Sequence, residues 1–270
     1  MAKKKLLLTL GVGYLCTQLP NINKVNIKED LNIAEVNTNA KQIIIFITNK
    51  NKCDSIFILC INNKSNNIKV VKFKNKLKIQ NENIIELYNN LGATSVISKL
   101  NESLGFSIQN YVKLDYLALI EVIEKLGGLK VKLNEYDKKL IFLDRELKEK
   151  ESCVLNSEEV VKYISFKSEK GCTKKDIRQK RAMKSLINNL MELSPKEFSR
   201  IVSNVIPFIE TTMSTKELVI MGVTCIKIGI DNVEKVFIPT KNNVMMVNSK
   251  VDDYKIENFI DEINNVLCNW

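Results

Sequence analysis

Residues 42–73 read QIIIFITNKNKCDSIFILCINNKSNNIKVVKF, and this stretch decides the fold class. The apolar runs 42–48 and 54–61 have the length of single strands and are rich in isoleucine, which is typical of buried strands. The polar stretch 62–67 follows them, and a third apolar run covers 68–73. We therefore predict a buried strand followed by a β-hairpin whose turn lies at 62–67.

The rest of the chain alternates between helical and strand patterns. The apolar spacing predicts a helix from Thr94 that ends at Gly105, a second helix over 116–126 and a strand over 129–133. It also predicts a strand over 236–238 and a terminal helix over 254–267. This alternation predicts the α/β class: a single layered domain over residues 42–270, with a central mixed β-sheet covered by helices on both faces.

Capping boxes mark further helix starts, because a side-chain oxygen there accepts hydrogen bonds from free amides of the first turn. We expect such boxes at 173–176, 194–197 and 214–217, the second with Pro195 at the first helical position. The helix after Thr173 is expected to be long. Its predicted buried residues are Met183, Leu186, Ile187 and Leu190.

The N-terminus has the pattern of a targeting segment. Lys3, Lys4 and Lys5 precede the apolar run 6–19, which is shorter than the roughly 20 residues of a spanning helix. Residues 1–20 are therefore predicted to be a signal peptide or a short membrane anchor, and the Asn-rich residues 21–41 a linker. This places the protein at the extracytoplasmic face of the cell membrane, or outside the cell. A buried N-terminal strand or helix is the alternative.

Composition restricts the chemistry. The chain has no histidine, which excludes histidine general bases and Ser-His or Cys-His dyads. Its formal net charge of +10 favours anionic partners, a solvated basic surface being the alternative. The 7 cysteines are scattered without a CxxC pair, which argues against a zinc ribbon or a disulfide framework. Chemistry must then rely on carboxylates, Lys and Arg, or a metal with oxygen ligands.

The order of several short segments resembles the LytR–CpsA–Psr family of cell-wall glycopolymer transferases over about residues 42–265. No segment is specific alone; their joint order and spacing carry the resemblance. The segments are NKCDS at 51–55 before the strand and hairpin, LG at 91–92 before a helix, NYVKLDY at 110–116, LGGL at 126–129, LNSEEVVKY at 155–163, KDIRQ at 175–179 and TMSTKEL at 212–218.

The resemblance implies phosphotransfer. Members of the family move a glycan phosphate from a polyprenyl-pyrophosphate carrier onto peptidoglycan or a related wall polymer. They use Mg²⁺, an Arg-rich pocket for the pyrophosphate and an apolar groove for the lipid. Such chemistry needs no histidine, because it depends on positioning and on neutralising oxygen charge. The implied partners are the polyprenyl-pyrophosphate-linked glycan, the wall polymer and the membrane surface.

Position by position, the resemblance assigns a site that is partly altered. Asp54 matches the family's acid and becomes the candidate Mg²⁺ ligand and catalytic carboxylate, while Arg178 and Gln179 match its Arg-Gln pair. The expected phosphate-binding residues are all lysines: Lys52, Lys74, Lys167 and Lys175. Lys76 and Cys172 stand where the family has acids. Lysine keeps the positive charge but lacks the planar fork of arginine that fits phosphate.

Several alternatives stay open at this point. The chain can be an active phosphotransferase or a non-catalytic homologue that binds the lipid-linked glycan. A basic nucleic-acid-binding regulator is the alternative from another class, although no helix-turn-helix or RNA-binding motif supports it. Asp54 can instead cap the start of its strand, and Arg178 with Gln179 can form a solvated first helical turn. Tyr111 and Asp115 are interpreted as structural residues that place the following helix against the sheet.

Overall fold

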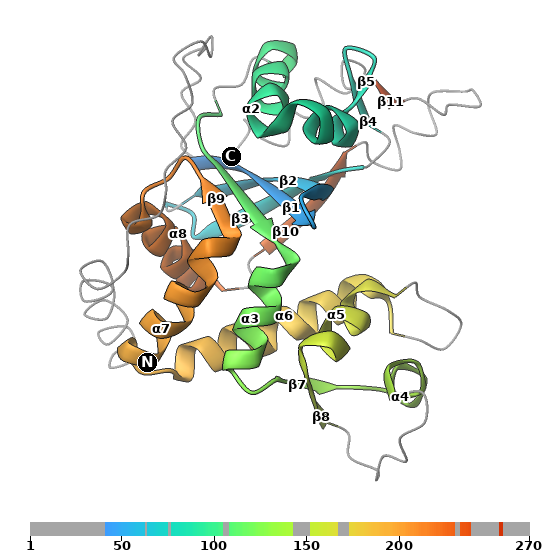
Figure 1. Ribbon diagram of the computed structural model, residues 1–270, viewed down its shortest axis with the longest axis vertical. Coiled ribbons are helices and arrows are strands. Elements are labelled where there is room, and N and C mark those ends of the chain that lie inside the picture. The colour runs from blue at the N-terminus through green and yellow to red at the C-terminus, as the bar shows by residue number, and fades with distance from the viewer. Residues whose placement is uncertain are drawn as a thin grey trace. The chain divides into compact units, whose positions relative to one another are not determined.

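The computed structural model describes residues 41–62, 64–74, 77–104, 108–142, 152–166, 173–229, 233–238 and 254–255 (Figure 1). The described residues within Asn21–Tyr116 and Ile209–Trp270 form one compact unit, the sheet unit. Those within Leu117–Phe208 form a second, the helical unit. Both units lie inside the single domain that the sequence predicts over 42–270, a boundary that stays a prediction.

A six-stranded mixed sheet forms the centre of the sheet unit, in the order β10-β3-β2-β1-β6-β9. Antiparallel pairs are β1/β2, β2/β3 and β6/β9, whereas β6 lies parallel to β1 and β10 parallel to β3. The strand bounds are β1 Lys41–Asn49, β2 Lys52–Asn62, β3 Asn67–Phe73, β6 Tyr111–Asp115, β9 Ile209–Thr211 and β10 Val233–Ile238.

The predicted hairpin is confirmed as β2 and β3. Its turn forms because the Asn62 side chain accepts hydrogen bonds from the backbone amides of Lys64 and Ser65, at 2.9 and 3.1 Å. Asn66 adopts a φ of 54°, a left-handed conformation that asparagine tolerates better than most residues. A small second sheet contains β4 Leu77–Ile79, β5 Glu82–Asn83 and β11 Tyr254–Lys255.

Helices cover both faces of the central sheet, which confirms the predicted fold class (Figure 1). The helix α2, Ile84–Leu104, packs on one face against alternate residues of the strands, such as Phe46 and Ile58. On the other face, α8, Thr215–Ile228, contacts the residues between them, such as Leu59 and Ile68. Side chains of a strand alternate between faces, so both faces of these apolar runs are buried.

The helical unit has its own core. Its elements are the helices α3 Tyr116–Lys125, α4 Glu135–Phe142, α5 Ser157–Ser165, α6 Lys175–Glu192 and α7 Pro195–Val205, the strands β7 Leu129–Lys132 and β8 Ser152–Leu155, and the short 3-10 turn η1 Ile206–Phe208. The first of these, α3, begins at the last residue of the sheet unit. β7 and β8 pair antiparallel. The buried core includes Ile123, Val131, Leu155, Val160 and Tyr163.

Two of the three predicted capping boxes are confirmed, at Ser194 and Ser214. The box at 173–176 is wrong, because α6 begins at Lys175 and its N-cap Lys174 makes no side-chain cap bond. The Thr173 hydroxyl instead accepts a hydrogen bond from the Asn134 amide at 3.3 Å. A further box, with Asn156 as N-cap, was missed.

Other differences concern helix ends and helix faces. The helix expected from near Thr94 is confirmed as the second part of α2, and the non-helical residue Gly92 (φ 82°) separates it from a shorter helix that begins at Ile84. Tyr254 lies in β11 rather than at a helix start; most of the expected terminal helix and Gly105 lie outside the described residues. On α6, Met183 is 47% exposed, whereas Arg178 and Ala182 are buried. The buried stripe of α6 therefore contains an arginine that apolar periodicity cannot detect.

Candidate functional site

Asp54 lies at an irregularity between β1 and β2. Ile47 pairs with Ser55 and Thr48 pairs with Cys53, so Asp54 is the extra residue of a β-bulge. Its carboxylate is exposed and accepts hydrogen bonds from the Tyr116 hydroxyl at 3.1 Å and from the Ser55 hydroxyl at 3.4 Å. The bulge thus takes Asp54, the predicted Mg²⁺ ligand, out of the regular strand pairing. The two hydrogen bonds hold its carboxylate in place.

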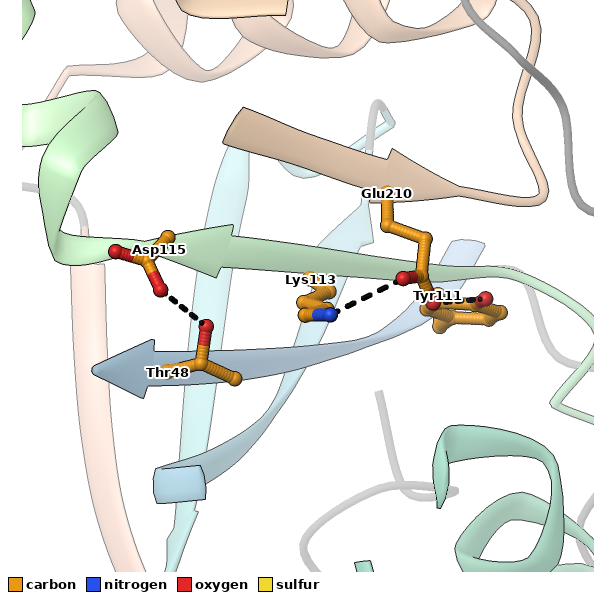
Figure 2. Close-up of polar contacts among 5 residues, drawn as sticks. All are labelled: Thr48, Tyr111, Lys113, Asp115 and Glu210. Carbon is orange, nitrogen blue, oxygen red and sulfur yellow. Dashed lines mark hydrogen bonds and ion pairs between the residues drawn. The ribbon is translucent and has the colours of Figure 1, made fainter. Parts of the chain in front are cut away.

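A second carboxylate, Asp115, lies at the same end of the sheet. It is the last residue of β6, which pairs in parallel with β1 so that Asp115 lies beside Thr48. The fully buried Thr48 donates a hydrogen bond from Oγ1 to Oδ2 of Asp115 at 3.1 Å (Figure 2). Thr48 therefore has Asp115 on one neighbouring strand and the Asp54 bulge on the other.

The environment of Asp54 disfavours further negative charge. Burial, together with the charge of Asp54 and the hydrogen bond to it, raises the pKa of Tyr116 to about 12. Burial also raises the pKa of the Cys53 thiol to about 12; a hydrogen bond with the Ser55 backbone opposes this shift and Asp54 adds to it. At neutral pH, Tyr116 is therefore a neutral donor to Asp54, and Cys53 is a poor nucleophile.

A second polar cluster joins Tyr111 and Lys113 of the same strand β6 to Glu210 of the neighbouring strand β9 (Figure 2). Glu210 of β9 accepts from the Tyr111 hydroxyl at 2.8 Å and from the Lys113 ammonium at 3.1 Å. Burial, the hydrogen bond to Glu210 and its charge raise the pKa of Tyr111. Tyr111 is 1% exposed and packs edge-on against Phe46, which agrees with a structural role.

The lysines predicted to bind phosphate lie on different elements of the structure. Lys52 is exposed and opens β2, two residues before Asp54. Lys74 is half-buried after β3, and its backbone amide donates to the Ile238 carbonyl at 3.0 Å. Lys175 is exposed at the first position of α6. Lys167, like Lys76 and Cys172, lies outside the described residues.

Arg178 has an environment that the sequence does not reveal. It is fully buried, and its guanidinium donates to the backbone carbonyls of Tyr163, at 2.6 Å, and of Thr173 and Phe166. The guanidinium also stacks on the Phe166 ring, 3.6 Å from its centroid. Gln179 is exposed, and its amide donates to the Ile164 carbonyl at 3.4 Å.

The predicted site residues thus form two sets that are described separately. Asp54, Lys52 and Lys74 belong to the sheet unit, whereas Arg178, Gln179 and Lys175 belong to the helical unit. Within the sheet unit the structure adds Asp115 and Thr48 to the candidate site. One general signal pointed to Asp115: it ends a strand that runs directly into a helix, and ligand sites in α/β sheets gather at the carboxyl ends of strands.

The oxygens near Asp54 suit a hard divalent cation. Mg²⁺ is commonly held by one or two carboxylates, with water and substrate phosphates completing its coordination. Asp54 and Asp115 supply such carboxylates, and the Tyr116 hydroxyl adds a neutral donor that orients one of them. Among the described ranges there is no group of three or more Cys, Asp or Glu residues placed to hold a metal.

The fold and these polar groups define a mixed α/β protein with carboxylates at the end of a central sheet. The model of the LytR–CpsA–Psr family matches residues 17–265, and the chain belongs to this family. No curated protein matches the sequence. Within the part of the chain that the structure describes, no helix combines the length and apolar character needed to cross a bilayer.

Several solved structures share the fold. TagV of B. subtilis is 16% identical with a TM-score of 0.57; the match covers 86% of this chain and 98% of TagV. TagT bound to LIIa-WTA is 14% identical with a TM-score of 0.57, covering 92% of this chain and 96% of TagT. The family protein YwtF (TagT) with bound octaprenyl pyrophosphate lipid is 13% identical with a TM-score of 0.54, covering 90% and 95%. At these identities the likeness concerns the fold.

Proposed function

We propose that this protein binds a polyprenyl-pyrophosphate-linked glycopolymer at the extracytoplasmic face of the membrane and transfers it to the cell wall. Family membership over residues 17–265 is the observation that carries the proposal. The solved relatives bound to octaprenyl pyrophosphate and to LIIa-WTA support this ligand class. The net charge of +10 agrees with a pyrophosphate ligand.

The carboxylates and the lysines have separate roles in this proposal. Asp54 and Asp115 would hold Mg²⁺, which would neutralise charge on the pyrophosphate oxygens. Lys52, Lys74, Lys167 and Lys175 would supply positive charge to the phosphates. In the transfer, an acceptor hydroxyl of the wall polymer forms a bond to the glycan-bearing phosphorus, and the bond from that phosphorus to the polyprenyl phosphate breaks. A carboxylate takes the hydroxyl proton.

A non-catalytic binding role is the second candidate, and one structural observation favours it. Arg178 donates hydrogen bonds to the backbone carbonyls of Tyr163, Thr173 and Phe166. Lys76 and Cys172 replace two acids that the family carries, so metal placement would be weaker than in a complete site. Charge neutralisation by lysine would survive, so binding without turnover fits these replacements.

Phosphate release and lipid binding separate the two candidates. Binding of octaprenyl pyrophosphate at low salt, with its dissociation constant rising as salt is added, is expected for both. Magnesium-dependent release of phosphate by the unmodified protein would establish cleavage of the pyrophosphate bond and exclude the non-catalytic role. If the protein is a binder, Lys76→Asp with Cys172→Asp should raise that release, and Asp54→Ala in the same background should remove the gain. Failure to bind at low salt would overturn the proposed function.

A further inference from the structure

The C-terminal end of α5 is held by side chains from α6. The last four carbonyls of a helix have no partner within the helix and carry partial negative charge. Two of these carbonyls of α5 accept hydrogen bonds from side chains of α6: that of Tyr163 from Arg178 at 2.6 Å, and that of Ile164 from Gln179 at 3.4 Å. Arg178 also donates to the carbonyl of Phe166, the C-cap residue. A cation at a helix C-terminus is stabilising, so the start of α6 caps the end of α5.

The peptide groups of Thr173 are held from two sides, two residues before α6. Its carbonyl accepts from Arg178, and its amide donates to Oδ1 of Asp137 at 3.0 Å. Asp137 is fully buried on α4, and its backbone amide is capped by Asn134 at 2.7 Å. Arg178 and Asp137 therefore tie the end of α5, the chain before α6 and the start of α4 into one network, the α5–α6 clamp.

Because Arg178 is buried, the α5–α6 clamp requires an arginine at this position. Removing a guanidinium from water is costly unless its donors are hydrogen-bonded, and here three carbonyls and the Phe166 ring surround it. The planar fork of arginine reaches separate carbonyls at once, whereas an ammonium group is a single point donor. A side chain with 0% exposure is also poorly placed to meet a solvated pyrophosphate.

We propose that Arg178 is a positioning residue of the α5–α6 clamp and that it fixes the first turn of α6, so that Lys175 and Gln179 face the phosphate ligand. The inference rests on the proposed function for the identity of that ligand. It changes the role of Arg178, which the family resemblance places in the pocket itself. Arg178 acts on binding through its neighbours and not through its own charge.

Salt dependence distinguishes the two roles. We would measure octaprenyl pyrophosphate binding in detergent micelles over a range of NaCl concentrations for wild type, Arg178→Lys, Arg178→Gln and the control Lys175→Ala. Arg178→Lys should weaken binding on the order of tenfold, because hydrogen bonds from a charged group are lost. Arg178→Gln, which also removes the charge, should weaken binding while the salt dependence stays as in wild type. Lys175→Ala should flatten the salt dependence, because an exposed ligand charge is removed. Flattening by Arg178→Gln would show direct phosphate contact and overturn the clamp; wild-type affinity of Arg178→Lys would overturn it as well.

A double-mutant cycle adds a readout that a general loss of stability would not move. Arg178→Lys combined with Gln179→Ala should be no worse than the weaker-binding single variant, because both act on the same turn. Additive losses would contradict the proposal. If Arg178→Lys does not fold, Asp137→Asn replaces it: it keeps an acceptor for Thr173, removes the negative charge and should reproduce the weaker binding. Unchanged binding by Asp137→Asn would then count against the clamp.

Hydrogen exchange separates failure of the clamp from failure of the proposed function. If the wild-type protein does not bind octaprenyl pyrophosphate at low salt, the proposed function fails. The clamp can still be read from backbone amides near 163–166 and 175–179, whose exchange should increase in Arg178→Lys and stay unchanged in Lys175→Ala. Equal exchange in wild type and Arg178→Lys would overturn the clamp whatever the ligand.

Discussion

At the scale of single residues, Asp54 and Asp115 carry the strongest functional expectation. Both carboxylates flank the end of β1, and each is held by a neighbouring hydroxyl, Tyr116 for Asp54 and Thr48 for Asp115. Neither hydroxyl removes the capacity of a carboxylate to bind a cation, because each carboxylate has several lone-pair directions. The pair therefore suits a cation shared with a phosphate ligand better than a closed structural metal site.

The first prediction concerns this pair. Asp54→Asn and Asp115→Asn should each reduce the gain in octaprenyl pyrophosphate affinity that Mg²⁺ provides, by roughly tenfold, because a neutral amide is a weaker Mg²⁺ ligand than a carboxylate. Asparagine keeps an oxygen that accepts from Thr48 or Tyr116, so the fold should persist. Titration with and without Mg²⁺ measures the effect, with the exposed Glu102→Gln as control. An undiminished magnesium effect in both variants would exclude the carboxylate pair as the cation site.

At the scale of elements, the turn between α3 and β7 depends on glycine. Gly128 has a φ of 104°, and a Cβ built there would lie 2.7 Å from the Leu155 carbonyl oxygen and 2.8 Å from Cγ1 of Val154. Both neighbours belong to β8, which pairs with β7. Gly128 thus allows the close approach of β8 as well as the left-handed backbone.

The second prediction compares two glycines. Gly128→Ala should lower the free energy of unfolding by about 2 kcal/mol or more, because it adds backbone strain to a steric clash. Gly222→Ala, on α8 with nothing within 4 Å of the new Cβ, should raise it by about 0.5–1 kcal/mol, since alanine favours helix. Urea unfolding of both variants measures these changes in the free energy of unfolding. Equal effects of the two substitutions would refute the account of Gly128.

At the scale of the whole molecule, the sheet unit contains several groups with raised pKa. Burial is the main cause for Cys53, Tyr88, Tyr111 and Tyr116, and the carboxylates Asp54 and Glu210 add to it. In the unfolded chain these groups lose their protons at lower pH than in the folded chain. The stability linked to them is fully present below about pH 9, the ordinary pKa of a thiol, and is lost as pH rises towards 12.

The third prediction follows from this loss of stability as the pH rises. The midpoint of urea unfolding should fall steadily between pH 9 and pH 11, at constant ionic strength. The double variant Cys53→Ala with Tyr116→Phe should lose less stability over the same range, because two of the shifted groups are gone. A midpoint that does not change with pH, or an equally steep loss in the double variant, would argue against this assignment.

The fourth prediction concerns the N-terminal segment. Lys3 to Lys5 and the apolar run 6–19 predict that the full chain is directed to the membrane. Fractionation of cells expressing the full chain and residues 21–270 should find the first with the membrane or outside the cell and the second in the cytoplasm. Equal recovery of both forms from the cytoplasm would contradict the export prediction.

Local patterns in the amino-acid sequence were enough to predict the α/β class, the β2–β3 hairpin, two helix starts and the family. These features depend on local patterns: the apolar period, turn residues, capping boxes and the order of short segments. The family match over 17–265 confirms the last of them. Asp54 was selected through the family resemblance, because it matches the acid that the family carries at the first strand. The same resemblance identifies Lys76 and Cys172 as positions where the family has acids.

The surroundings of those residues depend on contacts between distant positions that form only when the chain folds. Asp115 lies beside Thr48 because β6 pairs in parallel with β1, a contact between positions 67 residues apart. Arg178 is buried because α6 turns that face towards the end of α5, although charge would place it in water. Local patterns indicate the period of a helix or strand. They do not indicate its register or the face that it presents to a distant partner, because those depend on which carbonyls and side chains come into contact on folding.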